Sequence, residues 1–440
     1  MKIEVIKTYV LFILVGLSII LTYNIWTYQP NFELYDDKGE TYVPEVDFYL
    51  DGKTVTVNDV VIPTNILFHD EGKHYGFRQS VDEIRLFKDM QTWVLYNFSA
   101  GEFTGLPKGN RQVEIRFPTP LPLETMSDFF NFNEKVRNIP TWSFERIFIT
   151  FEKDQSSMRL HFPSIDGKQQ AVATIQQPEK ITLLQKYMNK KGNLQEYITF
   201  QENSVRPIYL LKDPVQKARR SLSVDVEELN RAPSKLINAL FSDPSVVTRN
   251  FSKGNIANYT DGRRQMQVGQ HRMSMEFTNP SQVDMKDSMK PIELIDKSIE
   301  NINEHKGWTE EFHLESLDMS EQKVKFLMYN NGVPILGGDD SQIIQEWYKQ
   351  ILFKYKRPLF QISDKIDEEM IELESGLSVV NYLSNQSKYD LDYITDIRVG
   401  YDLVYRDISS YIILLEPSWF INYKDSWVKI DMNEEEKEVN

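Results

Sequence analysis

Histidines and clustered acids are the residues of this chain that could bind a metal ion or transfer protons. His69 and His74 lie five positions apart, with Asp70 and Glu71 between them. Two imidazoles four positions apart on a helix can bind one zinc ion, as in the His-Glu-x-x-His motif, but this pair lacks that spacing and the chain lacks that motif. We therefore expect a polar hairpin at these histidines and no zinc site.

Two acidic clusters lie closer to the C-terminus. Residues 337–340 (GGDD) are similar to the acidic loop of nucleotide cyclases, but the rest of that motif does not follow, and a turn between strands explains them better. Asp390, Asp392 and Asp396 offer oxygen ligands for a hard cation, yet the glycine and the terminal glutamate that a calcium loop requires are missing. We therefore expect no metal and no other cofactor.

Catalytic motifs are missing from the region that follows the first thirty residues. It holds no Gly-x-Ser-x-Gly elbow and no phosphate-binding glycine loop, and the chain has no cysteine for thiol chemistry. With 65 acidic residues, chance pairs of carboxylates are common and carry no weight. We expect no catalytic residue and a protein that is not an enzyme.

The composition is that of a folded, acidic protein. Of its 440 residues, 41% are hydrophobic and 12% are aromatic, a larger share than disordered chains carry. The net charge of −15 repels phosphate backbones, so we expect no nucleic-acid partner. The length favours two or three domains.

An uncharged apolar segment near the N-terminus is the strongest signal in the sequence. Residues 9–26 contain no charged residue, and at 1.5 Å per residue a helix over them spans roughly 27 Å, close to the hydrocarbon thickness of a bilayer. Lys2 and Lys7 precede the segment, and no Lys or Arg follows before Lys38. This charge bias predicts a single-pass cell-membrane protein, with a cytoplasmic N-terminus and residues 30–440 outside. The alternative, a cleaved signal peptide, would have a shorter apolar core and a small-residue cleavage site.

One face of this predicted helix has the spacing of a packing seam. Ser18 and Thr22 form a small-xxx-small pair, which lets helix backbones approach closely in lipid. The alternative, that such spacing arises by chance, stays open. The predicted transmembrane interaction face consists of Leu11, Val15, Ser18, Thr22 and Ile25.

Periodicity in the outer region predicts helices that alternate with groups of strands, not a strict strand-helix-strand order. This pattern favours an α+β fold in which helices pack on antiparallel sheets. Helices are expected at 81–90, 123–133, 178–189, from an N-cap at Asp225 to about Phe241, 292–304 and 377–385. Strands are expected at 54–61, 66–69, 113–117, 145–152, 157–162, 169–175, 246–250, 255–259, 264–277, 310–317, 323–329, 343–360, 394–405, 411–423 and 427–430.

We interpret this order as an N-terminal transmembrane helix followed by about three α+β domains. Residues 1–28 form the cytoplasmic tip and the anchor. The predicted outer domains cover residues 29–205, 206–290 and 291–440.

Four short segments carry a family resemblance. They are residues 5–30, with VIKT, Leu21-Thr22, Trp26 and Pro30; residues 240–249 (LFSDPSVVTR) with 258–262 (NYTDG); residues 395–401 (TDIRVGY); and residues 417–423 (PSWFINY). These segments resemble the YycH regulators of Gram-positive bacteria. The similarity runs along essentially the whole chain, although the 206–220 stretch departs from the family.

The resemblance implies a function that cannot be predicted from composition. Members of the family have no known catalytic residues, and their later domains are similar to the sister protein YycI. They associate through transmembrane helices with YycI and with the essential cell-wall histidine kinase WalK, also called YycG, which they inhibit in some species and activate in others. The alternative is an extracytoplasmic binding module for a cell-wall fragment or peptide. Whether the outer region forms a homo-oligomer stays open.

Overall fold

The computed structural model describes Ser18 and residues 49–107, 109–136, 138–152, 156–201, 206–252, 256–280, 288–407 and 410–432. The chain divides into two compact units, Met1–Glu40 and Thr41–Asn440. Ser18 is helical and exposed; the rest of the predicted anchor and interaction face, including Leu11, Val15, Thr22 and Ile25, lies outside the described residues. Within the described part of the chain, no helix is long and apolar enough to cross a membrane.

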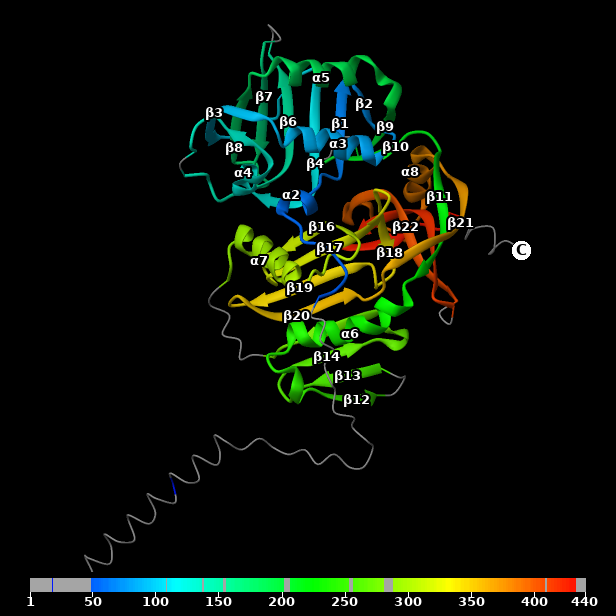
Figure 1. Ribbon diagram of the computed structural model, residues 1–440. Coiled ribbons are helices and arrows are strands. Elements are labelled where there is room, and N and C mark those ends of the chain that lie inside the picture. The colour runs from blue at the N-terminus through cyan, green and yellow to red at the C-terminus, as the bar shows by residue number, and fades with distance from the viewer. Residues whose placement is uncertain are drawn as a thin grey trace, which may run out of the picture. The chain divides into compact units, whose positions relative to one another are not determined.

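The first half of the second unit forms one large sheet, called the first sheet below (Figure 1). Its ten strands follow the order β10-β9-β2-β1-β4-β6-β7-β8-β3-β5. All neighbouring pairs are antiparallel except β3 and β5. The strands are β1 (Asn65–Asp70), β2 (Lys73–Phe77), β3 (Val94–Glu102), β4 (Arg111–Pro122), β5 (Asn131–Phe132), β6 (Ser143–Phe151), β7 (Met158–Pro163), β8 (Gln169–Ile175), β9 (Leu194–Phe200) and β10 (Ile208–Leu211).

Two amphipathic helices, α3 (Ser80–Met90) and α5 (Pro178–Asn189), pack against the first sheet. Leu86, Phe87 and Leu184 bury their side chains in the core that these helices share with the strands. The helices are joined by an ion pair from Lys180 Nζ to Asp89 Oδ1 at 2.8 Å. Apolar residues spaced three and four apart therefore place one face of each helix on the sheet.

The rest of the second unit forms a second sheet of fourteen strands. Twelve of them follow the order β12-β13-β14-β15-β20-β19-β17-β18-β22-β23-β11-β21, while β16 pairs with β17 and β24 with β23. The contact of β18 with β22 is parallel. The strands are β11 (Val215–Val224), β12 (Thr248–Ser252), β13 (Ile256–Thr260), β14 (Gln265–Val268), β15 (Ser274–Thr278), β16 (Glu311–Asp318), β17 (Lys323–Asn330), β18 (Val333–Gly337), β19 (Gln342–Tyr348), β20 (Ile351–Pro358), β21 (Ile362–Leu373), β22 (Ile394–Asp407), β23 (Ile412–Tyr423) and β24 (Ser426–Lys429).

Three further helices accompany the second sheet: α6 (Val226–Leu240), α7 (Pro291–Glu304) and α8 (Gly376–Asn385). Helix α6 begins where predicted, because the Asp225 carboxylate accepts the backbone N–H of Glu228 at 3.0 Å and so caps the first turn. Helix α5 and strand β8 also have the predicted bounds. The α+β class predicted from the sequence is confirmed.

Two predicted elements near the N-terminus are wrong. The expected strand at 54–61 contains a one-turn helix, α2 (Val57–Val60), because Asp59 accepts hydrogen bonds from both the backbone N–H and the hydroxyl of Thr56 at 2.8 Å. This local capping arrangement outweighs the strand preference of the valines. The expected helix at 123–133 is reduced to a 3-10 turn and α4 (Met126–Phe129), after which β5 begins.

Two predicted strands in the second half are hairpins. The run 264–277 splits into β14 and β15, and His271 between them has a φ of 67°. The run 343–360 splits into β19 and β20 at Lys349 and Gln350, whose φ angles are 49° and 63°. A left-handed turn is normally marked by Gly or Asn. Positions 349 and 350 hold Lys and Gln, so the turn could not be predicted from the sequence.

A single hydrophobic core extends through both sheets. It includes Phe68 and Ile115 of the first sheet together with Phe326 and Ile343 of the second. A smaller core joins β9 and β10 of the first sheet to α8 and β22. The domain boundaries predicted at 205/206 and 290/291 stay predictions.

Gly376 allows this smaller core to close. It is the first residue of α8, and a Cβ at this position would collide with the backbone carbonyl of Leu211 at the end of β10. We expect Gly376→Ala to lower the free energy of unfolding by at least about 1 kcal/mol, because overpacking against backbone forces the helix to shift. Urea unfolding measures the change. Gly101→Ala is the control, since no atom lies within 4 Å of a Cβ there, and equal effects of the two substitutions would contradict the prediction.

Candidate functional site

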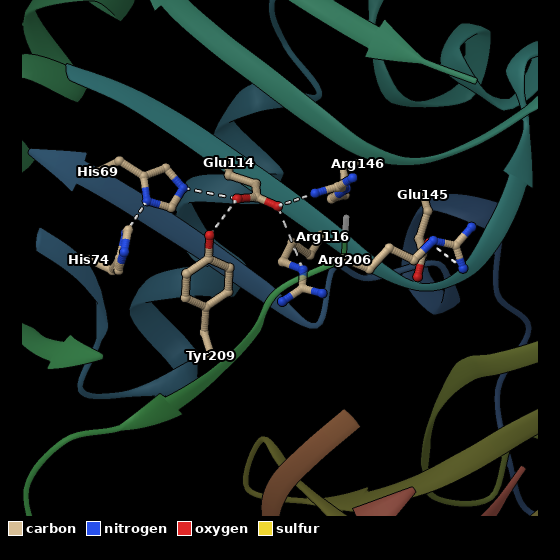
Figure 2. A network of polar contacts seen from close by, with 8 residues as sticks. All are labelled: His69, His74, Glu114, Arg116, Glu145, Arg146, Arg206 and Tyr209. Carbon is tan, nitrogen blue, oxygen red and sulfur yellow. Dashed lines mark hydrogen bonds and ion pairs between the residues drawn. The ribbon is translucent and has the colours of Figure 1, made fainter. Parts of the chain in front are cut away.

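A cluster of charged and polar side chains is buried in the first sheet (Figure 2). His69 of β1 lies directly opposite His74 of β2, so the predicted polar hairpin at this pair is confirmed. Glu114 lies on the neighbouring strand β4, where apolar residues flank it on both sides. We call this cluster the first network; its members are His69, His74, Glu114, Arg116, Arg146 and Tyr209.

Glu114 lies at the centre of the first network, and its side chain is only 2% exposed. One carboxylate oxygen, Oε2, lies 3.0 Å from Nε2 of His69 and accepts a hydrogen bond from the Tyr209 hydroxyl at 3.4 Å. The other oxygen, Oε1, lies 3.7 Å from the guanidinium groups of both Arg116 and Arg146. A carboxylate can only accept, so His69 carries its proton on Nε2.

The two imidazoles share one further hydrogen bond, with 2.6 Å between their Nδ1 atoms. Burial lowers the pKa of His74 to about 4, and the charge of His69 acts in the same direction. His74 is therefore neutral at neutral pH. Burial alone would raise the pKa of Glu114, but the hydrogen bond from His69 and the positive charge of Arg116 outweigh burial and lower it.

The first network holds a buried charge among paired polar groups. His69 is 7% exposed, and Tyr209 and Arg116 line pockets next to the network. The Arg116 guanidinium also stacks over the Tyr209 ring, with 5.3 Å from Cζ to the ring centroid. These contacts tie β10 to the centre of the first sheet. Buried charges are retained when they are paired in this way.

A second network lies in the second sheet and consists of Glu315, Asp396, Arg398 and Trp427. Arg398 Nη2 lies 2.6 Å from Asp396 Oδ2, and its Nη1 lies 3.4 Å from Glu315 Oε2. Trp427 donates its indole N–H to Glu315 Oε1 at 2.9 Å. Burial opposes the charge of Arg398, but the Asp396 and Glu315 carboxylates outweigh burial and raise its pKa. Burial raises the pKa of Glu315, and Arg398 offsets only part of this.

A pocket of about 150 Å³, called the junction pocket below, lies where the two sheets meet. Tyr209 of the first network and Arg398 of the second both line it. The turn between β17 and β18 closes one side, where Gly332 packs against Ser80 of α3 so closely that a Cβ would collide with the serine side chain. Gly332 also has a φ of 70°, which favours glycine. The junction pocket is therefore built by segments far apart in the sequence.

The other acidic clusters singled out in the sequence have structural roles. The 337–340 segment is a turn between β18 and β19, as predicted, and Asp340 accepts a hydrogen bond from the Tyr405 hydroxyl at 2.7 Å. Asp390 caps a short 3-10 turn by accepting the N–H of Asp392 at 3.1 Å. Asp396 belongs to the second network, so these acids are not brought together around one cation.

The central residues of both networks were not predicted from the sequence. Glu114 and Arg116 stand out as two charges on one face of the apolar strand 113–117, and this placement is the signal that could have revealed the first network. Glu315 and Arg398 lie 83 positions apart and pair only through the fold. No spacing in the sequence could have indicated the second network.

These features define an α+β protein with two large sheets, a shared core and buried charges that are paired within each sheet. Residues 4–193 match the family model of the YycH protein, N-terminal domain, and residues 216–437 match that of the YycH protein, C-terminal domain. The chain belongs to the YycH family.

A relative from Bacillus subtilis (strain 168) is similar over nearly its whole length. This protein, the two-component system WalR/WalK regulatory protein YycH, is 24% identical over 449 residues, which cover 98% of the present chain and 97% of the relative. The crystal structure of YycH from Bacillus subtilis matches the fold with a TM-score of 0.70 and 20% identity, and the match covers 88% of this chain and 100% of that one.

Proposed function

We propose that this protein is a membrane-anchored, non-catalytic regulator of a WalK-type sensor histidine kinase. It acts together with a YycI-like regulator, and the residues outside the cytoplasm begin near residue 30. The observation that carries the proposal is the near-complete overlap with a WalR/WalK regulatory protein, in which 98% of this chain and 97% of the relative correspond. The match to the N-terminal family model begins at residue 4 and so includes the predicted anchor.

Contact between transmembrane helices is the mechanism that we propose for regulation. A regulator shifts a kinase between two states only through a difference in its affinity for them. The face formed by Leu11, Val15, Ser18, Thr22 and Ile25 supports such a contact, because small hydroxyl-bearing residues allow close approach and hydrogen bonding between helices in lipid.

The double substitution Ser18→Leu and Thr22→Leu tests this mechanism. We expect it to reduce co-purification of the full chain with the kinase, because the larger side chains separate the helix backbones. Gly16→Leu is the matched control, since on a helix it lies on the side opposite to Ser18 and Thr22. If the double variant retains both co-purification and signalling, or if Gly16→Leu is equally harmful, the interaction face is excluded.

Binding of a cell-wall fragment or peptide by the outer region is a second candidate function. The junction pocket is the observation that favours it, because concave pockets with apolar and a few polar side chains are typical ligand sites and this one could receive an end group of such a ligand. In this case the anchor would only hold the binding region at the membrane. Muropeptides that release no heat on mixing with the full chain would leave this candidate without support.

A further inference from the structure

The junction pocket contains a lysine with no charged partner. Lys217 lies near the start of β11 and lines the pocket with a half-buried side chain. Among the described residues, none places a carboxylate within ion-pair distance of its ammonium group or accepts a hydrogen bond from it. Burial lowers the pKa of Lys217, and the positive charge of Arg220 lowers it further. A half-buried charge in this position is costly unless an anion pairs with it.

The other basic side chains that line the pocket each have a hydrogen-bond or ion-pair partner. Arg398 is already paired with Asp396 and Glu315 in the second network. His313 Nε2 lies 3.1 Å from its own partner, Glu311. Arg78, which is exposed, donates its Nε–H to the Leu194 carbonyl at 3.1 Å. Arg398 and His313 therefore have acidic partners, whereas Lys217 is the half-buried cation of the pocket without one among the described residues.

Glu83 is the acid that lines the junction pocket, and it is neutral at neutral pH. Burial raises its pKa to about 8, although its carboxyl accepts the backbone N–H of Ile66. A protonated carboxyl group donates one hydrogen bond and carries no charge. The neutral Glu83 carboxyl therefore does not compensate the positive charge of Lys217.

Apolar side chains make up much of the remaining pocket wall. The Tyr197 ring lies over Gly76 of β2, where a Cβ would come within 2.7 Å of the ring. A cavity volume of about 150 Å³ suits one small organic molecule. The apolar residues that line the pocket are Ile62, Phe77, Ile84, Leu210, Val333 and Ile397.

We propose that the junction pocket binds a small monocarboxylate, whose carboxylate pairs with Lys217 and whose apolar body contacts these apolar side chains. Arg78, the other lining cation without an acidic partner, is exposed to solvent, so one half-buried cation matches one negative charge. The neutral Glu83 carboxyl adds a hydrogen-bond donor without repelling the ligand. A phosphate dianion would carry a second negative charge into a half-buried site, where it would lack a partner. This inference goes beyond both proposed functions, because it concerns a ligand smaller than a cell-wall fragment and does not depend on regulation of the kinase.

Thermal unfolding of the full chain in detergent tests the proposal, with isobutyrate as the probe. A ligand that binds only the folded state raises the Tm with its concentration, and the dependence gives Kd. Isobutyrate replaces chloride at constant ionic strength and neutral pH, and isobutyramide is the neutral probe of the same shape. We expect isobutyrate to raise the Tm and isobutyramide to have a much smaller effect.

Lys217→Met is expected to weaken isobutyrate binding at least about tenfold, because it removes a charge-assisted hydrogen bond. Lys212→Met is the matched control: Lys212 is exposed, pairs with Glu196 at 3.1 Å and lies outside the pocket, so its loss changes the net charge equally and should leave Kd unchanged. If Lys217→Met does not fold, Lys217→Gln serves in its place.

Three results would overturn the proposal: no rise in Tm with isobutyrate, an equal rise in the Lys217 variants, or tighter binding of isobutyramide or inorganic phosphate than of isobutyrate. Each of these outcomes is independent of the Ser18 and Thr22 experiment. A failure of the pocket proposal can therefore be told apart from a failure of the kinase proposal.

Discussion

Glu114→Ala is expected to lower the free energy of unfolding by about 3–5 kcal/mol, the usual cost of removing one partner from a buried ion pair. The substitution would leave Arg116 and Arg146 facing each other without the carboxylate that lies 3.7 Å from both. It would also remove the acceptor for His69 and Tyr209. Urea unfolding of the full chain in detergent, followed by tryptophan fluorescence, measures the change.

Two further substitutions separate the causes of this loss. Glu145→Ala is the control, because Glu145 pairs with Arg206 at 3.5 Å near the surface (Figure 2), and such pairs contribute at most about 1 kcal/mol. Glu114→Gln keeps an acceptor for His69 but removes the charge, so we expect an intermediate effect. If Glu114→Ala costs no more than Glu145→Ala, the first network does not stabilise the fold.

The stability of the protein should fall between pH 6.5 and pH 8. Burial raises the pKa of Glu83 to about 8 and that of Glu310 to about 7. In this range the unfolded chain has lost these protons and the folded chain still holds them, so each rise in pH favours unfolding. One such group contributes at most about 1.4 kcal/mol per pH unit, which gives about 2 kcal/mol over the range for Glu83.

Buried histidines act in the opposite direction at lower pH. Burial lowers the pKa of His74 to about 4 and of His305 to about 3, so between these values and about 6.5 the unfolded chain binds more protons and stability rises with pH. The two buried glutamates oppose this rise from about pH 4.5, the ordinary pKa of their carboxyl groups. The two effects therefore roughly cancel between about pH 4.5 and pH 6.5, and the net loss of stability begins at about pH 6.5.

In Glu83→Gln the free energy of unfolding should fall less steeply between pH 7 and pH 8 than in the unaltered protein. The glutamine still accepts the N–H of Ile66 and has no proton to lose. Glu310→Gln keeps an acceptor for the N–H of Ile362, and its free energy of unfolding should fall less steeply with pH below pH 7. Unfolding curves recorded across the pH range test both effects. A decline of the same slope in Glu83→Gln and in the unaltered protein would show that Glu83 is ionised in the folded state.

Elements whose cause is local could be predicted from the sequence. Helix α6 begins at an aspartate that caps its first turn, and helix α5 begins at a proline, which is favoured at the first helical position. The predicted secondary structure was wrong at two kinds of position. Thr56 and Asp59 form a helical turn inside a run of valines, and Lys349 and Gln350 make a left-handed turn without a glycine.

Pairing between distant segments could not be predicted. Strand β21 is exposed and highly charged, so its composition did not indicate a strand, and it is held by β11 nearly 150 residues earlier through contacts such as Arg219 to Glu369 at 3.3 Å. The α+β class and the Asp225 cap follow from the sequence alone, because they depend on periodicity and on neighbours along the chain. The tertiary structure alone decided which charges are paired. Glu315 pairs with Arg398, whereas Lys217 in the junction pocket has no acidic partner among the described residues. Burial and distance are set only when the two sheets pack together.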